Sequence, residues 1–199
     1  MKLMANVRTA DRHLTQQAAS RIPQRVGRLL SGVEEAAESS KLWCGAAAVM
    51  TACGGRRGRG AAIAGLTALA FAQLVSNGVG KQLFDRPRPP KEWIDHDEVE
   101  DRPDSSSFPS GHTAAAVAFT AAVAPLWPLA AAACGVPTAL VALERVQSGA
   151  HYPTDVAAGA LIGLAGARLT RHVPHLLRHV LQRSRTVPQL RHSAARSSF

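Results

Sequence analysis

Charged residues are missing from two long stretches of this 199-residue chain. No Asp, Glu, Lys or Arg occurs from Gly60 to Gly80 or from Ser105 to Leu143. About 20 uncharged, mostly apolar residues can cross a bilayer. The longer stretch therefore predicts two crossings, with a turn near Pro125 and Pro128. A mean hydropathy of -0.02 hides this segregation, which favours a multi-pass membrane protein over a soluble one.

Acidic residues are missing from the C-terminal part of the chain. None follows Asp155, whereas seven arginines do: Arg168, Arg171, Arg178, Arg183, Arg185, Arg191 and Arg196. A basic tail after an apolar segment is typical of the cytoplasmic membrane face. No interleaved aromatic residues or nucleic-acid module accompany it, which argues against nucleic acid as a partner. We expect residues 173–199 to form a mobile cytoplasmic tail.

Cysteine is scarce, and its pattern predicts no metal site. Cys44, Cys53 and Cys134 lie in apolar surroundings without metal-ligand spacing, so we expect small buried hydrophobic side chains. The acidic residues within 92–104 are expected to form a solvated loop rather than a cation site, and no cofactor is predicted. The polar N-terminus has no apolar core of a leader, so we expect no cleavable signal peptide.

The remaining pattern is helical throughout, without internal repeats or strand-forming segments. Residues 1–40 predict an amphipathic segment, helical from Thr9 to Ser39 and kinked at Pro23, which lies at the interface or caps the bundle. A membrane-embedded core is expected over 41–172. Leu42–Cys53 either just spans or is partly inserted, and Gly54–Gly60 is expected to be a basic loop.

The fold class predicted is an all-α membrane bundle of about five membrane-associated helices plus the N-terminal amphipathic segment. After Leu42–Cys53, its helices are expected at about Ala61–Val79, Ser110–Ala124, Leu126–Glu144 and Thr154–Leu169. Short Arg-rich loops stay in the cytoplasm, so the Gly54–Gly60 loop sets the orientation. The helix ends near Lys81, Ser110 and Arg145 then all face the extracytoplasmic side. Arg21, Arg25 and Arg28 fit this orientation poorly if Leu42–Cys53 spans.

His151 and Asp155 stand four residues apart where the last helix begins. A carboxylate so placed can reach back to one imidazole nitrogen, fix the tautomer and leave the other nitrogen free to attack. The alternative is an ordinary helix start, with Thr154 as N-cap and a surface histidine. Taken alone, this pair does not decide between the two.

A second group lies at Pro109-Ser110-Gly111-His112. Ser110 is a good N-cap, the Gly111 amide sits at a helix N-terminus where anions bind, and His112 could donate a proton to a leaving oxygen. Plain N-capping is the simpler interpretation. Lys81, Arg88 and Arg145 could bind phosphate or merely snorkel to the interface, but snorkelling does not explain why all three fall on the histidine side.

Together these residues resemble the type 2 phosphatidic acid phosphatase superfamily, whose pattern vanadium haloperoxidases share. The resemblance covers about Leu66 to Leu169 and rests on three motifs: Lys81 with six residues to Arg88-Pro89, Pro109-Ser110-Gly111-His112, and Arg145 with five residues to His151 and three more to Asp155. One departure is visible, because Glu144 stands where the family usually has Ser. It adds a negative charge beside Arg145.

The resemblance implies a role for each position. His151 would be the nucleophile and form a phosphohistidine, Asp155 would orient it, and His112 would protonate the leaving group. Phosphate would be bound by Lys81, Arg88, Ser110, Gly111 and Arg145 without a metal. Arg86 is an additional cation whose role the motifs do not define; the substrate head group is one candidate partner.

The function predicted is a lipid phosphate or pyrophosphate phosphatase of a bacterial inner membrane, with its site on the extracytoplasmic side. Expected substrates are a polyprenyl (undecaprenyl-type) phosphate or pyrophosphate, phosphatidic acid or phosphatidylglycerol phosphate. The alternatives are a vanadate-dependent haloperoxidase and a non-catalytic membrane protein that binds or transports anionic lipids. The sequence leaves the lipid and the oligomeric state open.

Overall fold

The protein is described by a computed structural model that covers residues 2–21, 23–94 and 105–172. Within those ranges every regular element is a helix, which confirms the predicted all-α class. The predicted tail at 173–199 and most of the acidic loop, residues 95–104, lie outside the described residues.

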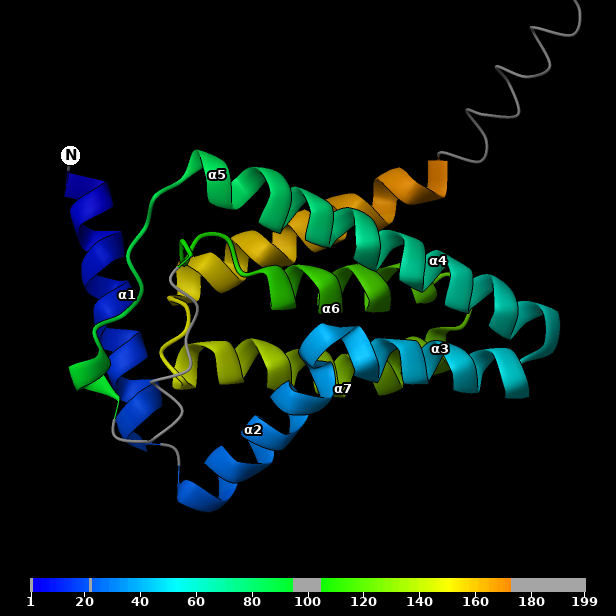
Figure 1. Cartoon of the computed structure of the whole chain (residues 1–199), viewed down its shortest axis with the longest axis horizontal. Coiled ribbons are helices and arrows are strands. Elements are labelled where there is room, and N and C mark those ends of the chain that lie inside the picture. The colour runs from blue at the N-terminus through cyan, green and yellow to red at the C-terminus, as the bar shows by residue number, and fades with distance from the viewer. Residues whose placement is uncertain (1, 22, 95–104, 173–199) are drawn as a thin grey trace, which may run out of the picture.

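The N-terminal segment forms two helices that meet at Pro23. α1 (Lys2–Arg21) and α2 (Gln24–Ala37) are separated there by extended backbone, as the predicted kink requires. α1 lies across one end of the bundle, whereas α2 packs along α7 (Pro128–Gln147) (Figure 1). A short 3₁₀ turn (Glu38–Ser40) then leads into α3 (Lys41–Cys53). This segment therefore covers the bundle from its end and from one side.

α4 begins earlier than the sequence indicates, so the predicted basic loop at Gly54–Gly60 is wrong. The helix runs over Gly55–Gln73, continues as the π-helical η2 (Leu74–Gly80) and ends in α5 (Lys81–Leu83). A Cβ on Gly58 would lie only 1.9 Å from the Met50 carbonyl oxygen. Gly54 and Gly58 thus allow close packing of α3 against α4, whereas Gly55 supplies the positive φ of 54° at the turn between the two helices.

The remaining helices agree with the predicted boundaries to within a few residues. α6 spans Gly111–Val123, α7 spans Pro128–Gln147 with Pro137 inside it, and the last described helix covers 153–172. The turn between α6 and α7 occupies 124–127, where the two prolines predict it. A short 3₁₀ element, η3 (Lys91–Trp93), follows the chain segment after α5.

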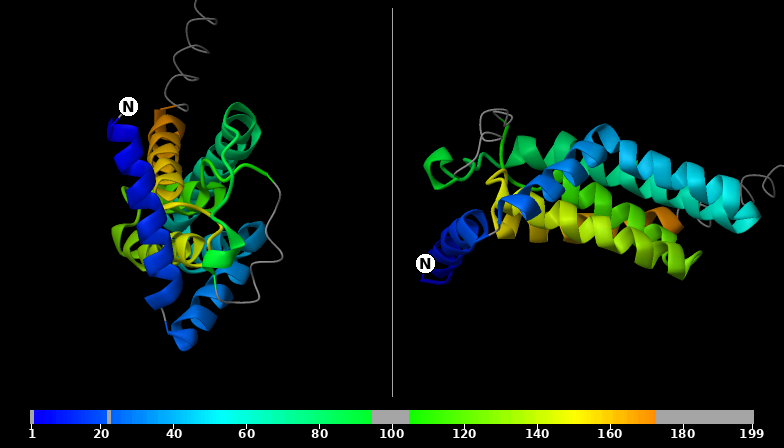
Figure 2. Two further views of the ribbon diagram at one scale, coloured as in Figure 1. Left: turned by 90° about the vertical axis from the view of Figure 1, so that its left-hand side faces the viewer. Right: turned by 90° about the horizontal axis from the view of Figure 1, so that it is seen from below.

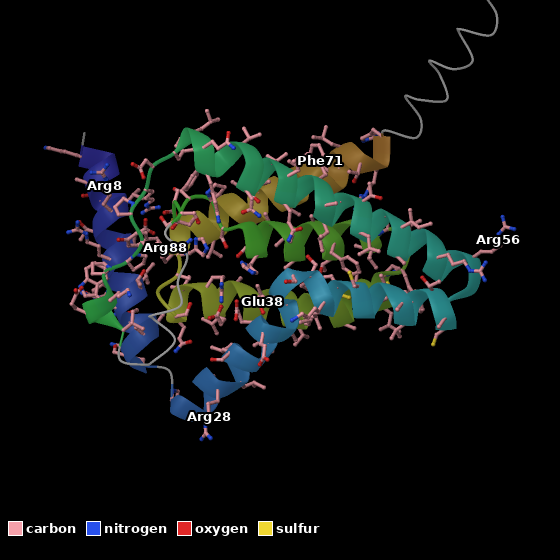
Figure 3. The ribbon with its side chains drawn as sticks, viewed as in Figure 1. Arg8, Arg28, Glu38, Arg56, Phe71 and Arg88 are labelled. Carbon is pink, nitrogen blue, oxygen red and sulfur yellow. The ribbon has the colours of Figure 1, made fainter. Side chains whose placement is uncertain are left out.

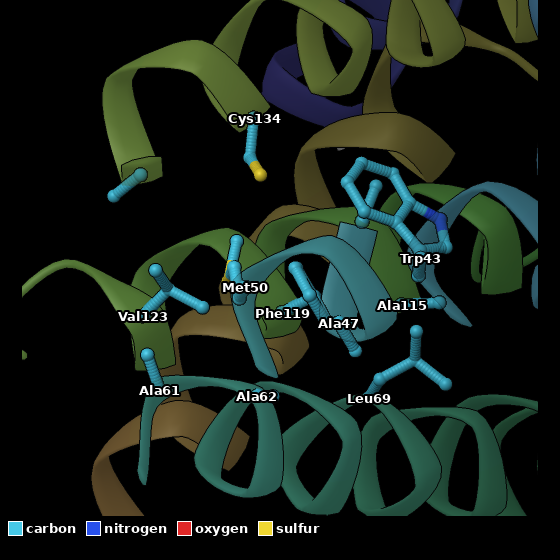
Figure 4. Packing of buried hydrophobic residues seen from close by; sticks show 12 residues of the cluster. Trp43, Ala47, Met50, Ala61, Ala62, Leu69, Ala115, Phe119, Val123 and Cys134 are labelled. Atoms are coloured by element: carbon cyan, nitrogen blue, oxygen red, sulfur yellow. The ribbon is translucent and has the colours of Figure 1, made fainter. Parts of the chain in front are cut away.

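Small residues let these helices approach closely. α4 packs chiefly on α6 and α3, and α6 also packs on α7. Half of the buried residues in their shared core are alanines, and they surround two aromatic rings, Trp43 and Phe119, whose centroids are 5.3 Å apart (Figure 4). A Cβ on Gly65 would come within 2.8 Å of the Phe119 ring. Such small-residue packing is typical of membrane helix bundles.

Two helical stretches are long and apolar enough to cross a membrane. Gly55–Leu83 and Pro128–Gln147 each reach a hydropathy of 1.5, yet only 33% and 22% of their apolar windows are buried inside the protein. A core helix of a soluble protein would be mostly buried. Large apolar side chains instead point outward along the bundle, among them Ile63, Leu74, Leu129, Val136, Leu161 and Leu164. This exposed apolar surface favours membrane-spanning helices over the core of a soluble protein.

α3 does not cross a bilayer by itself. Its 13 residues extend only about 20 Å, against about 30 Å of hydrocarbon. Cys44 and Cys53 are exposed on the bundle, which corrects the expectation of three buried cysteines; only Cys134 is buried. In a membrane protein an outward apolar surface contacts lipid, so an exposed thiol needs no protein core around it.

The polar motifs gather at one end of this bundle. Figure 3 shows Arg8 and Arg88 at that end and Arg56 at the opposite one. Viewed from the end, α1 crosses in front of the helix termini (Figure 2, left). The end of α5, the start of α6, the end of α7 and the start of helix 153–172 all lie at this end of the bundle (Figure 1).

Candidate active site

His151 lies in the tight turn that joins α7 to the last helix. Gly149 takes a positive φ of 64°, a conformation that suits glycine. The backbone N–H of His151 then donates to the Arg145 carbonyl, at 2.8 Å. The side chain is only 3% exposed. The chain thus folds back on itself, which fixes the imidazole next to the C-terminal end of α7.

The Ser107 carbonyl sets the tautomer of His151. Its oxygen lies 2.5 Å from Nδ1. A carbonyl can only accept, so Nδ1 carries the hydrogen and Nε2 keeps the lone pair. The nearest Asp155 carboxylate oxygen, Oδ2, is 3.9 Å from Nδ1, which is too far for a hydrogen bond. The sequence predicts Asp155 in this orienting role, yet the direct contact belongs to Ser107.

Asp155 is fully buried and tied to other groups around the nucleophile. Its Oδ2 accepts the Tyr152 N–H at 2.8 Å, and its Oδ1 accepts Arg86 Nη1 at 2.5 Å. Its backbone carbonyl also accepts the N–H of Ser110, at 3.0 Å. Asp155 therefore fixes the turn that carries His151 and joins that turn to the start of α6.

The predicted N-cap of α6 is confirmed. Ser110 Oγ accepts the Thr113 N–H at 3.4 Å, and the serine is completely buried. A Cβ on Gly111 would lie 2.5 Å from Asn77 Oδ1, so a larger residue here would have to displace the Asn77 side chain of η2. His112 follows in the first turn. The close packing of Gly111 thus places His112 beside the end of the long helix that leads to Lys81.

Lys81 and Arg88 are linked through Ser105. Lys81 Nζ lies 3.4 Å from Ser105 Oγ, and Arg88 Nε donates to the Ser105 carbonyl at 3.1 Å. Arg88 Nη1 also donates to the Ala150 carbonyl, at 2.8 Å, directly beside His151. Two residues predicted to bind phosphate are therefore held together next to the predicted nucleophile.

Arg145 is held between two carboxylates. Its Nη2 lies 2.9 Å from Glu34 Oε1 on α2, and its Nε contacts Glu144 Oε2. Glu144 is 1% exposed, so its charge is buried directly beside the arginine. The predicted negative charge near the site is present, and a second acid from the N-terminal segment joins it.

Electrostatics shows that the three cations and the two histidines form one cluster. Lys81, Arg88 and Arg145 each interact electrostatically with the side chains of both His112 and His151. Burial, followed by the charges of Arg88 and Arg145, lowers the pKa of His151 well below its usual 6.5. His151 is therefore neutral at physiological pH, as attack on phosphorus requires.

Arg86 does not face this cluster. Its guanidinium contacts the carboxylates of Asp11 and Asp155 and lies 4.3 Å above the Tyr152 ring. Assignment of Arg86 to the substrate head group therefore has no support from these contacts. The sequence gives no signal for Asp11 or Glu34, because each reaches the site only through the packing of α1 and α2. The Ser107 contact also has no sequence signal, because every residue has a backbone carbonyl.

Among the residues that the structure describes, no group of three or more His, Cys, Asp or Glu side chains is close enough to hold a metal ion. The cluster consists of three cations and two imidazoles.

A helical bundle with two histidines and three cations at one end is an arrangement suited to binding and transferring phosphate. Residues 61–178, more than half of the chain, match the PAP2 superfamily, and the chain belongs to that superfamily. This confirms the resemblance inferred from the three motifs.

Curated relatives match only part of this chain. A lipid A 1-phosphatase of Rhizobium johnstonii is 45% identical over 67 residues, which are 32% of this chain and 26% of that protein. A lipid A 1-phosphatase of Rhizobium etli is 47% identical over 60 residues, 29% of this chain and 25% of that protein. The match thus spans about a quarter of the length of these relatives.

Two solved structures share the fold. The PAP2-type phosphatidylglycerolphosphate phosphatase from Bacillus subtilis superposes with a TM-score of 0.64 at 23% identity, over 85% of this chain and 87% of that one. Aquifex aeolicus LpxE gives a TM-score of 0.63 at 20% identity, over 79% and 92%. At these identities the likeness establishes the fold alone.

Proposed function

We propose that the protein is a metal-independent phosphatase that removes phosphate from a membrane lipid through a phosphohistidine on His151. The observation that carries this is the convergence of His112 and His151, from different elements, on one cluster of three cations. Cations alone would suffice for binding an anionic lipid. A buried neutral imidazole with a fixed tautomer beside them is what turnover needs and binding does not.

The first half-reaction transfers the phosphoryl group to the protein. Burial and the three cations lower the pKa of His112 to about 4 in the free protein, so His112 takes up its proton together with the anionic phosphate, whose charge raises that pKa. Nε2 of His151 attacks phosphorus, the bond from phosphorus to the lipid oxygen breaks, and protonated His112 gives its proton to that leaving oxygen. Lys81, Arg88 and Arg145 neutralise the charge on the phosphoryl oxygens, together with the amide of Gly111 at the N-terminus of α6. Asp155 holds the turn on which His151 is presented.

The second half-reaction returns the protein to its starting state. Neutral His112 takes a proton from water, the water oxygen bonds to phosphorus, and the phosphorus–nitrogen bond breaks to release inorganic phosphate. Nε2 of His151 recovers its lone pair, and His112 is protonated for the next cycle. No metal or external cofactor enters either step.

The substrate we propose is a phosphate or pyrophosphate on a lipid head group. The site lies at one end of a bundle whose sides are apolar, so a lipid can keep its chains in the bilayer while its phosphate reaches His151. This end is the extracytoplasmic one if the arginines at the start of α4 stay in the cytoplasm. Polyprenyl pyrophosphate, phosphatidic acid and phosphatidylglycerol phosphate are candidates, and the names of the Rhizobium relatives add the 1-phosphate of lipid A.

Phosphate release from these four lipids in detergent micelles, with EDTA present, tests the proposal. We expect wild-type protein to release phosphate from at least one of them. His151→Ala protein should release none, although its thermal unfolding temperature should equal that of the wild type. Cys44→Ser is the matched control, because Cys44 is exposed on the bundle away from the cluster. Lipid binding without phosphate release from any of the four would support the binding or transport alternative instead.

A further inference from the structure

Asp11 is an unusual residue on an otherwise exposed helix. Most side chains of α1 are exposed or half-buried, yet Asp11 is only 3% exposed. Its carboxylate accepts three hydrogen bonds: from Arg86 Nη2 at 2.7 Å, from the Thr154 N–H at 3.1 Å and from Thr154 Oγ1 at 2.6 Å. A buried carboxylate is stable only with such partners, so these contacts fix α1 to the bundle end.

One of these contacts caps the helix that carries Asp155. The alternative of an ordinary helix start has Thr154 as the N-cap of helix 153–172, but the Thr154 N–H itself donates to Asp11. An acidic side chain from α1 therefore satisfies a free N–H in the first turn of another helix. A negative charge at this position also interacts favourably with the helix dipole.

The other contact reaches the nucleophile's turn through Arg86. The Arg86 guanidinium bridges two carboxylates, with Nη2 on Asp11 and Nη1 on Asp155. Nη1 also donates to Thr154 Oγ1, at 2.7 Å. The two acids surround one cation, so removal of Asp11 leaves Arg86 with a single carboxylate and more freedom to move. Arg86 is the only Lys or Arg side chain that pairs with Asp155 among the described residues, so Asp155 is then held less firmly.

We propose that Asp11 is a positioning residue, which holds Arg86 and Thr154 so that Asp155 and the turn bearing His151 keep their reactive geometry. The inference rests on the proposed phosphatase function. It extends the working site to α1, which lies outside the segment matched by the superfamily, residues 61–178. Asp11 itself touches no reacting atom.

A cavity next to Asp11 makes a specific chemical test feasible. An open cavity of about 590 Å³ lies between α1 and the segment 84–87, beside Phe108 and Tyr152. Asp11 and Arg86 both line it. A small carboxylate such as formate can enter this cavity. It can then occupy the position vacated in Asp11→Ala protein and pair with Arg86.

The experiment compares wild-type, Asp11→Ala, Asp11→Asn and His151→Ala proteins with the same lipid. We expect both Asp11 variants to lose about tenfold to a hundredfold in kcat, with KM changed less than about threefold, because a displacement of the nucleophile by about 1 Å has an effect of this size. Sodium formate should restore part of the kcat of Asp11→Ala, and sodium chloride at equal ionic strength should not. Glu38→Gln, which removes an exposed acid, should behave as wild type.

The outcomes separate the two proposals. Wild-type kcat in both Asp11 variants, with His151→Ala inactive, would overturn the positioning role and leave the phosphatase proposal standing. A loss of kcat that formate does not restore in Asp11→Ala would also overturn it, as a sign of general loosening. If Asp11→Ala fails to fold, Asp11→Asn decides by its kcat at unchanged KM. Phosphate release by His151→Ala protein would overturn both proposals.

Discussion

Gly159 is a position outside the cluster of histidines and cations where a single methyl group should clearly disturb catalysis. It lies in helix 153–172, and a Cβ there would sit 2.4 Å from the Ser110 carbonyl oxygen and 3.3 Å from the Ala114 N. Ordinary van der Waals contact begins at 3.4 Å. The start of α6 would therefore have to move away from helix 153–172 by about 1 Å, since backbone atoms cannot rotate aside.

Gly159→Ala separates the two helices that carry the acid and the nucleophile's turn. Because His112 follows Ser110 by two residues, a shift of about 1 Å should lower kcat about a hundredfold. Overpacking of this kind also costs about 1–3 kcal/mol of folding free energy. The assay is phosphate release in detergent, at a temperature where both proteins stay folded. Thermal unfolding is measured separately on the same samples.

Gly135→Ala is the matched control, because a Cβ on Gly135 meets nothing within 4 Å. It should retain wild-type kcat and unfolding temperature. Wild-type kcat in Gly159→Ala protein would refute the reasoning, since the two helices would then tolerate separation or never approach this closely. A loss equal in both variants would also refute it.

Three further predictions concern charge and protonation. Burial, followed by the charges of Arg88 and Arg145, lowers the pKa of His151 well below 6.5. Protonation of Nε2 should therefore reduce kcat/KM only at pH values well below 6.5. A decrease in kcat/KM toward acid with its midpoint above pH 6.5 would contradict this. As pH falls, the unfolded chain binds a proton at His151 before the folded protein does, because the pKa is lowered only in the folded protein. The free energy of unfolding should therefore decline as pH falls below 6.5. Denaturation curves measured over this pH range should show a smaller decline for His151→Ala protein. Glu144→Gln removes a buried negative charge beside Arg145. At an assumed separation of roughly 8 Å and an effective dielectric constant of about 20, this charge repels one phosphate charge by about 2 kcal/mol, so inorganic phosphate should inhibit the variant about thirtyfold more tightly. An unchanged inhibition constant would show that Glu144 does not affect phosphate binding.

The sequence predicts most of the helices because the signals that define them are local. Uncharged stretches, Ser110 as N-cap, and the prolines near 125 and 23 each act within a few residues of where they stand. The prediction fails at Gly54–Gly60, where glycine and arginine read as a loop. The helical start there depends on how closely α3 approaches α4, and no local pattern encodes that distance.

The site shows the same division. His112, His151 and the three cations could be identified from motif spacing, and the structure places them in one electrostatic cluster. The contacts of Asp11 and Glu34 could not, because both residues reach the site from the N-terminal helices across long sequence separations. The partner of His151 Nδ1 was also missed, since a backbone carbonyl leaves no residue-type signal.

The phosphohistidine on His151 is the central claim, and trapping it is the most direct test. The protein is mixed with lipid substrate carrying labelled phosphate and quenched within milliseconds in alkaline detergent, because a phosphorus–nitrogen bond hydrolyses in acid. Mass spectrometry of the digested protein should then find phosphate on the peptide that contains His151, and none in His151→Ala protein. Turnover of the lipid with phosphate on another residue, or with no phosphorylated protein at any quench time, would contradict the account.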